Sequence, residues 1–293
     1  MGSTINTNGI SLNAQRNLAA SQASLATSMQ RLSSGMRVNS ARDDAAGLAI
    51  AERMNAQSRG MTVAARNAND AISLAQTAEG MLGKVSDTLQ RMRELAVQAA
   101  NATYNDSDRT SLDAEFSQLQ AEVKRVLNNA SFNNTALFGT TGSMSFQVGA
   151  GTTADDVVDI AQQALSGGTA GTSGAVDSSD DPDVVLATVT DAADIAADQD
   201  AAVNAMKDID VAIDFINAER ATYGAALNRF EAVISNLAIA NENTEAARGR
   251  IMDADFAIET SNLSRAQILQ QVGNAMVAQA NQVPQGVMVL LKG

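Results

Sequence analysis

Apolar residues recur at alternating three- and four-residue steps along four long stretches of the chain, which cover residues 78–99, 112–126, 206–237 and 269–290. This spacing places them on one side of an α-helix that packs against other helices. The third stretch, over about residues 201–245, would extend roughly 65 Å at 1.5 Å per residue. The pattern predicts a mainly α protein, a long antiparallel bundle or coiled coil formed by the N- and C-terminal halves.

Polar and small residues mark where these helices end. In "RLSSGMRVNSARDDAAGLAI", Ser33, Ser34 and Gly35 end the first helix, and Asp43 or Asp44 is suited to cap the next. In "NATYNDSDRTSL", Asp108 or Thr110 is predicted to start the helix that follows.

The middle of the chain has a different pattern. "FNNTALFGTTGSMSFQVGAG" places apolar residues around Gly139 and Gly142 and alternates with period two in "MSFQV", which predicts a β-hairpin. Residues 151–200 are rich in Ala, Asp, Gly, Ser and Thr and predict a short, variable, solvent-facing module with a short helix at 157–165. We therefore expect five segments: 1–40 and 246–293 as the two parts of an inner core, 41–150 and 201–245 as the two parts of a helical rod, and 151–200 as the outer module.

Both ends of the chain carry an apolar stripe that nothing further along the chain can cover. The two terminal helices could cover each other, and the apolar surface that remains would then be buried between molecules. We accordingly predict that these residues form a core or assembly stripe: Leu18, Leu25 and Leu32 near the N-terminus, and Leu269, Val272, Met276, Val283, Val287 and Leu290 near the C-terminus.

Composition and charge limit the classes of function that are open to this chain. The 293 residues are 45% apolar but only 3% aromatic, with no Trp, so Ala, Leu, Ile, Val and Met must fill the core. The net charge is −13, and residues 151–200 hold 11 Asp with no Lys, Arg or Glu. An acidic chain with few aromatic residues disfavours binding to nucleic acid, and its charge repels anionic membranes.

Most catalytic and metal chemistry is excluded by residue type. The chain has no His and no Cys, which rules out Ser-His-Asp and Cys-His arrangements and the usual zinc ligands. Asp155, Asp156 and Asp159 could form an acid-base pair or a calcium site in an adhesin or enzyme, but they lack the ligand order of an EF-hand loop. We interpret them as solvated surface and expect no catalytic residue, metal or cofactor.

Long blocks of the sequence resemble the terminal regions of bacterial flagellin. They are "LSSGMRVNSARDDAAGLAIA", "RNANDAISLAQTAEG", "QRMRELAVQAAN" and "RIMDADFAIETSNLSRAQILQQVGNAMVAQANQVPQGVMVLL". The resemblance implies a structural subunit that is exported unfolded by the flagellar type III system and polymerises under a cap protein into the extracellular filament that drives swimming. The N-terminal segment lacks the features of a cleavable secretory signal, which agrees with that route. The terminal segments would be disordered in the monomer and form the inner layer of the filament.

The resemblance also implies partners. The block "QRMRELAVQ" matches the stretch that Toll-like receptor 5 recognises in some family members, and its contacts would carry over to Gln90, Arg91, Leu95 and Glu122. The C-terminal helix resembles the segment held by the flagellin export chaperone. The alternative is a hook–filament junction protein, which has related terminal helices.

Overall fold

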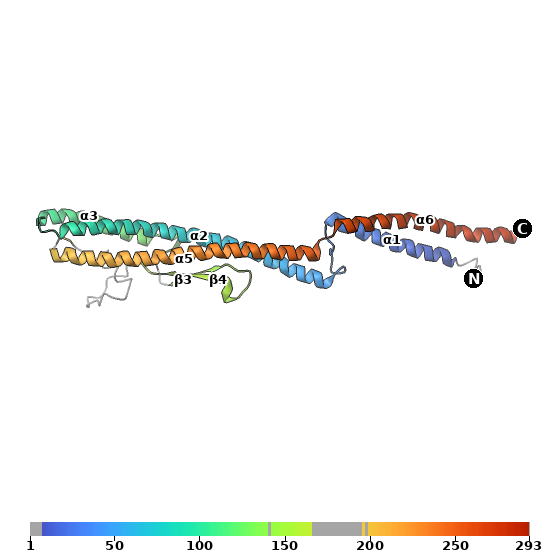
Figure 1. Cartoon of the computed structure of the whole chain (residues 1–293), viewed down its shortest axis with the longest axis horizontal. Coiled ribbons are helices and arrows are strands. Elements are labelled where there is room, and N and C mark those ends of the chain that lie inside the picture. The colour runs from blue at the N-terminus through green and yellow to red at the C-terminus, as the bar shows by residue number, and fades with distance from the viewer. Residues whose placement is uncertain (1–7, 140–141, 166–194, 197–198, 293) are drawn as a thin grey trace. The chain divides into compact units, whose positions relative to one another are not determined.

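A computed structural model describes the backbone of residues 8–139, 142–165, 195–196 and 199–292, and the side chains of these ranges up to Gln282. The chain divides into two compact units (Figure 1): residues 1–58 with 242–293, and residues 59–241. Helices α2 (Ala45–Ala99) and α5 (Gln199–Met252) each run from one unit into the other. Each unit is therefore built from chain segments that are far apart in the sequence.

Within residues 59–241, α2 and α5 pack with α3 (Asp106–Asn129) around one apolar core. The predicted stripes supply it, which confirms the predicted helical rod. Its fully buried members include Leu82, Leu89, Met92, Phe116, Ile209, Ile216, Tyr223 and Phe230.

The start of α3 differs from the sequence prediction. The helix begins at Asp106, so the predicted starts at Asp108 and Thr110 were wrong. Asn105 caps it: its side chain accepts a hydrogen bond from the Asp108 backbone N–H (2.9 Å), and the Asp108 carboxylate accepts one from the Asn105 N–H (3.2 Å). This reciprocal arrangement satisfies two N–H groups that the helix itself cannot pair, and so it fixes the earlier start.

Two small antiparallel sheets pack on the helices of this unit. Strand β1 (Ser131–Phe132) pairs with β2 (Thr135–Ala136), and β3 (Gly142–Gln147) pairs with β4 (Val157–Gln162). Asn133 and Asn134 have φ of 48° and 65°, the left-handed pair that a two-residue hairpin turn requires. The predicted β-hairpin is confirmed as β-structure, but its turn lies at Asn133 and Asn134 and not around Gly139 and Gly142, because β3 pairs with β4.

The helix predicted at 157–165 was wrong, because this segment forms β4, preceded by the short 3₁₀ helix η1 (Ala154–Asp156). Val158 and Ile160 are buried while Asp159 between them is exposed, which is the two-residue period of a strand. The partner strand holds Phe146, whose ring meets Phe230 edge-on with centroids 5.7 Å apart. Residues 157–165 therefore belong to the packed core rather than to a solvent-facing module. Residues 166–194 lie outside the described residues, so the outer module stays a prediction.

In the other unit, α1 (Gly9–Ser34) and α6 (Phe256–Lys292) pack side by side and antiparallel (Figure 1). Gly35 ends α1 with φ of 72°, which confirms the predicted break, since few other residues adopt this conformation without strain. Asp44 caps α2 by accepting a hydrogen bond from the Gly47 N–H at 2.8 Å, as one of the two predicted caps. The prediction that the two termini pair with each other is confirmed for the described residues.

Candidate assembly surface on the terminal helices

The contact between α1 and α6 follows a seven-residue repeat made mostly of small or polar side chains. We call it the seam. On α1 it consists of Ser11, Ala14, Leu18, Ser21, Leu25, Ser28 and Leu32, and on α6 of Glu259, Leu263, Ala266, Gln270, Gly273, Val277 and Ala280. Small residues let the two helix backbones approach closely: a Cβ atom on Gly273 would lie 3.0 Å from Leu18 Cδ1. The seam consequently buries little apolar surface for its length.

Polar contacts fix both ends of this helix pair. At the end formed by the chain termini, the Asn8 side chain donates to the Ala280 carbonyl (2.7 Å), and the Ser11 hydroxyl hydrogen-bonds the Asn281 side chain (2.7 Å). At the other end, Arg31 lies 3.9 Å from the carboxylate of Glu259.

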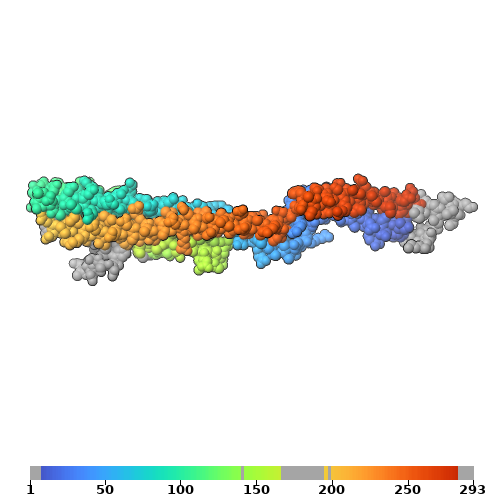
Figure 2. Space-filling model, viewed as in Figure 1, coloured from blue at the N-terminus to red at the C-terminus, as the bar shows by residue number. Residues whose placement is uncertain are grey.

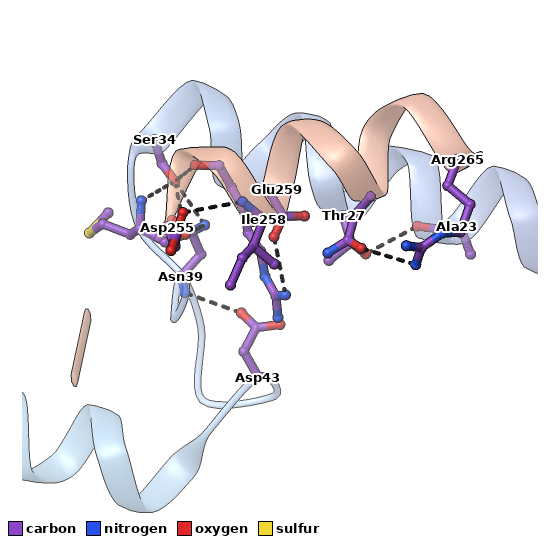
Figure 3. Close-up of polar contacts among 12 residues, drawn as sticks. Ala23, Thr27, Ser34, Asn39, Asp43, Asp255, Ile258, Glu259 and Arg265 are labelled. Atoms are coloured by element: carbon purple, nitrogen blue, oxygen red, sulfur yellow. Dashed lines mark hydrogen bonds and ion pairs between the residues drawn. The ribbon is translucent and has the colours of Figure 1, made fainter. Parts of the chain in front are cut away.

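The segment that leaves α1 is tied to the segment that enters α6. Met36 and Asp253 form an antiparallel bridge, and the Ala254 N–H donates to the Gly35 carbonyl at 2.9 Å. Figure 3 shows Ser34 at the end of α1, Asn39 and Asp43 in the turn that follows, Asp255 directly before α6 and Glu259 on its first turn. Hydrogen bonds from the Ser40 hydroxyl and the Asn39 backbone lower the pKa of Asp43, so this carboxylate stays ionised. The turn thereby holds the end of α1 beside the start of α6.

A second apolar face of α6 is not covered by α1. Ile258, Leu269, Val272 and Met276, which we call the α6 ridge, are each 50–60% exposed. At 3.6 residues per turn the ridge lies about a quarter turn around the helix from the seam. Leu269, Val272 and Met276 are thus not covered by α1, because smaller residues of α6 occupy the seam. Their predicted burial between molecules stays a prediction.

The remaining residues of the predicted stripe divide between the seam and the undescribed side chains. Leu18, Leu25 and Leu32 are half-buried in the seam. Val283, Val287 and Leu290 continue the spacing of the ridge along α6, but their side chains lie outside the described residues. The stripe predicted from sequence is thus a seam on α1 and a separate, exposed ridge on α6.

A groove runs beside the ridge. It has a volume of about 550 Å³ and lies between α1 and α6, where the two helices touch in the space-filling view (Figure 2). Small side chains of α1 line one wall together with Arg31, and Leu269 of the ridge lies on the other wall with Glu259 and Arg265. The small α1 residues are Ala20, Ser21, Ala23, Ser24, Thr27 and Ser28. Ridge and groove together give this pair of helices an uneven, partly apolar surface of the kind that receives another helix.

Two parts of the chain match known families. Residues 5–143 match the bacterial flagellin N-terminal helical region, and residues 206–291 match the bacterial flagellin C-terminal helical region. The chain is 41% identical to a flagellin of Halalkalibacterium halodurans over 289 residues, which covers 98% of this chain and 99% of that protein. This chain belongs to the bacterial flagellin family.

The chain is also similar to other flagellins. The flagellin of Bacillus subtilis is 39% identical over 307 residues, covering 98% of this chain and 99% of that protein. A crystal structure of Bacillus cereus flagellin is 29% identical with a TM-score of 0.45, covering 59% of this chain and 88% of that one. Flagellins are structural proteins that polymerise into the bacterial flagellar filament, and this chain is a filament subunit rather than a hook–filament junction protein.

The four residues carried over as receptor contacts of flagellins do not share one surface here. Gln90 and Arg91 are exposed on α2, and Glu122 is exposed on α3. Leu95 is 1% exposed and belongs to the core of residues 59–241, so its side chain packs within this chain, and its role as a receptor contact stays a prediction. Its spacing of three residues from Met92 indicated this burial already in the sequence.

The exposed members of this set are engaged with neighbours. Arg91 donates to Glu115 of α3 (2.8 Å) and to Glu94 (2.9 Å). Glu122 accepts two hydrogen bonds from Arg125 (2.6 and 2.7 Å), which lower the pKa of this carboxyl. Glu122 lines a groove between α2 and α3, whereas Gln90 lines another with Arg93 and Glu94.

Two of the three carboxylates considered for a metal or acid-base site accept hydrogen bonds in the β3–β4 sheet and its loop, and the third, Asp155, is exposed. Asp156 accepts hydrogen bonds from the Thr153 hydroxyl (2.6 Å) and from the backbone N–H groups of Thr153 and Gly151, and these bonds lower its pKa. Asp159 accepts one from the Ser145 hydroxyl at 2.6 Å. Within the described residues no three acidic side chains cluster as metal ligands, and none of the described helices is long and apolar enough to span a membrane.

Proposed function

We propose that the α6 ridge is the surface through which this flagellin contacts neighbouring subunits in the filament. The observation that supports it is the exposure of Ile258, Leu269, Val272 and Met276 on a helix whose covered side holds Glu259, Gln270 and Gly273. A helix that exposes its larger apolar residues and buries smaller ones has not yet met its main partner.

Subunit contact would supply what the α1–α6 pair lacks. Full burial of a Leu, Val, Ile or Met side chain contributes about 1.5–3 kcal/mol relative to exposure. An open helical polymer also requires the contact to join two different surfaces of successive subunits, since a self-complementary patch would close into a dimer. The groove beside the ridge, lined by small residues of α1, offers such a second surface.

The proposal is tested by placing charges on the ridge. In the variant Leu269→Asp with Met276→Asp, the critical concentration for polymerisation onto filament seeds should rise at least about 100-fold, since two apolar contacts are replaced by buried charges. Sedimentation of filaments at increasing subunit concentration measures this value.

The chain offers a matched control. Gln267 and Asn274 have the same seven-residue spacing, are exposed on the same helix and lie on its opposite side from the ridge. Gln267→Asp with Asn274→Asp adds the same charge and should leave the critical concentration within a few-fold of the native value. Equal polymerisation of the two double variants would sink the proposal. Unchanged unfolding of residues 59–241 shows that the rod is intact in both.

We also propose that the chain reaches the extracellular filament by flagellar type III export, with cap and hook-junction proteins as assembly partners and an export chaperone holding α6. The family resemblance supports this route. The ridge gives the chaperone a physical reason to bind, because an exposed apolar stripe needs to be covered before export.

Recognition by Toll-like receptor 5 is likewise a proposal, supported by the resemblance of "QRMRELAVQ" alone. Its test uses the exposed members of the set. Arg91→Ala and Gln90→Ala should weaken receptor signalling by monomers without loss of fold, whereas Leu95→Ala would confound signalling with damage to the core. Native signalling from both single variants would remove this partner.

A further inference from the structure

A single charged pair lies in the otherwise uncharged seam. Glu259 is 6% exposed on the first turn of α6, and the Arg31 Nη1 atom lies 3.9 Å from its Oε2 atom on the last turn of α1. Glu259 is the one acidic residue in the sequence of α6, and the sequence of α1 contains no acidic residue at all. The pair is therefore unique within these two helices.

The surroundings favour this position for both charges. The positive end of the α6 dipole lies near Glu259, and the negative end of the α1 dipole lies near Arg31, so both helix ends stabilise the pair. Asp43 adds a second negative charge that interacts with Arg31. The Arg31 Nε atom is buried and has no hydrogen-bond partner among the described residues. Arg31 is therefore attracted by two carboxylates, one at the start of α6 and one in the turn after α1.

The rest of the seam distinguishes poorly between alignments. A slip of one heptad would replace Leu18 by Leu25 or by Ser11 opposite Gly273, and would exchange Ser21 for Ser28. These exchanges leave much the same mixture of small and apolar contacts. By contrast, the same slip moves Arg31 away from Glu259 and leaves a buried carboxylate without its partner, which is strongly unfavourable.

We propose that Arg31 and Glu259 are positioning residues that fix the antiparallel register of α1 with α6. A polar pair in a coiled coil can specify alignment at a cost in stability. Here the buried carboxylate of Glu259 and the partly exposed Arg31 act together with the backbone bridge between Met36 and Asp253 beside them. The Asn8 and Ser11 hydrogen bonds at the other end of the pair agree with the same register.

The register matters for assembly, and this consequence rests on the proposed role of the α6 ridge. A one-heptad slip would displace the ridge along α1 by about 10 Å. Ridge and groove would then no longer present one fixed surface to the next subunit. The pair thus allows a weak seam to present a defined contact surface.

The register can be measured by disulfide trapping, because the native chain has no Cys. A Cβ atom on residue 273 lies 3.6 Å from the Leu18 Cβ, which suits a disulfide, so Leu18→Cys with Gly273→Cys reports the observed register. Leu25→Cys with Gly273→Cys and Ser11→Cys with Gly273→Cys report a slip of one heptad in either direction. The full chain is oxidised in a glutathione buffer below the polymerising concentration, and intramolecular disulfides are quantified by mass spectrometry.

We expect the Leu18/Gly273 disulfide to exceed either slipped disulfide by about tenfold or more, the ratio that a difference of one buried charge pair readily produces. Glu259→Arg should reduce the ratio to within about twofold, because Arg31 then repels the helix that it normally aligns. The exchange Arg31→Glu with Glu259→Arg should restore most of the preference, although both charges then oppose the helix dipoles. Arg16→Glu, an equal change of charge at an exposed position of α1, should leave the preference unchanged.

Three results would overturn the proposal: no preference in the native pair, an undiminished preference in Glu259→Arg, or no recovery in the exchanged pair at equal helix content. Because trapping is read in unpolymerised chains, it can fail or succeed independently of the α6 ridge. Polymerisation can then be measured in the same variants. If Glu259→Arg loses polymerisation and regains it once the Leu18/Gly273 disulfide has formed, the register is needed for the contact made by the α6 ridge.

Discussion

The two compact units bury opposite kinds of residue at their helix contacts. In residues 59–241 the fully buried side chains are large, among them Leu89, Phe116 and Tyr223. In the α1–α6 pair the most deeply buried residues of the contact are Ser11, Ser28, Ala266, Ala280 and Glu259, while the larger apolar residues of the α6 ridge are exposed. The first unit is stabilised by its own core, whereas the second leaves its larger apolar side chains uncovered within the chain, where the proposed subunit contact would bury them.

This difference follows from where each helix finds its neighbours. α2, α3 and α5 surround a common core, so one apolar stripe on each is buried within the chain. α1 and α6 form a single pair, and two helices can cover only one side of each other. The family to which the chain belongs explains the arrangement, since a filament subunit needs one part that folds alone and another that becomes buried on assembly.

The sharpest test of this contrast compares one leucine from each region. Leu89→Ala removes a fully buried side chain of α2 and should lower the free energy of unfolding of residues 59–241 by about 2–5 kcal/mol. Leu269→Ala, at a half-exposed ridge position, should change the free energy of unfolding of the monomer by less than about 0.5 kcal/mol. Denaturant unfolding of both unpolymerised variants measures these values, and similar losses would remove the distinction between the regions.

Tyr223 sharpens the comparison from within the core. Its ring packs edge-on against Phe138 with centroids 6.5 Å apart, but its buried hydroxyl has no hydrogen-bond partner among the described residues. Tyr223→Phe keeps the ring contact and removes the unpaired group, so it should stabilise this unit by on the order of 1 kcal/mol. The melting temperature should then rise by roughly 2–4 °C. A marked loss of stability would instead reveal a partner for the hydroxyl.

Glu219 is a buried acidic residue of the same core and lies one turn before Tyr223 on α5. Burial raises the pKa of Glu219 above its ordinary 4.5, and burial together with the charge of Glu219 raises the pKa of Tyr223 to about 12. Because the folded state binds this proton more tightly than the unfolded state, the stability associated with Glu219 is complete below pH 4.5 and is lost as pH rises through the folded pKa.

Glu219→Gln should remove this dependence. The variant should gain stability relative to the native protein as pH rises from 4 to 7, with no further change above the raised pKa. Lowered pKa values at other carboxylates, such as Asp210 beside Arg93, have the opposite sign, so the difference between the two proteins is the quantity to follow. Parallel stability curves over this range would show that Glu219 is not desolvated.

The helical rod was predictable from sequence because its stripes are long and regular. Ala78, Leu82, Val85 and Leu89 repeat over so many turns that no strand or loop could use the pattern. Short elements were less predictable. The six residues of β4 could be interpreted as a helical turn. They form a strand because they pair with β3, and a local sequence pattern cannot show a contact with a residue far along the chain.

The assembly surface was predictable in kind but not in detail. The sequence of α6 has two candidate faces for the contact with α1, one with Ala266 and Val277 and the other with Leu269 and Met276. Spacing predicted the second as a core or assembly stripe but did not show which face meets α1. The structure uses the first, because small residues allow α1 to approach closely. The pairing of Arg31 with Glu259 was also missed, although the scarcity of charge in both helices was a visible signal.

The most direct test of the central claim is hydrogen exchange of the full chain as monomer and as filament. The claim predicts that amides of α2, α3 and α5 within residues 59–241 exchange slowly in both states, whereas those of α1 and α6 become slow only in the filament. Equally slow exchange of α1 and α6 in the monomer would contradict it, since the terminal pair would then be stable without the contact that its exposed ridge is proposed to make.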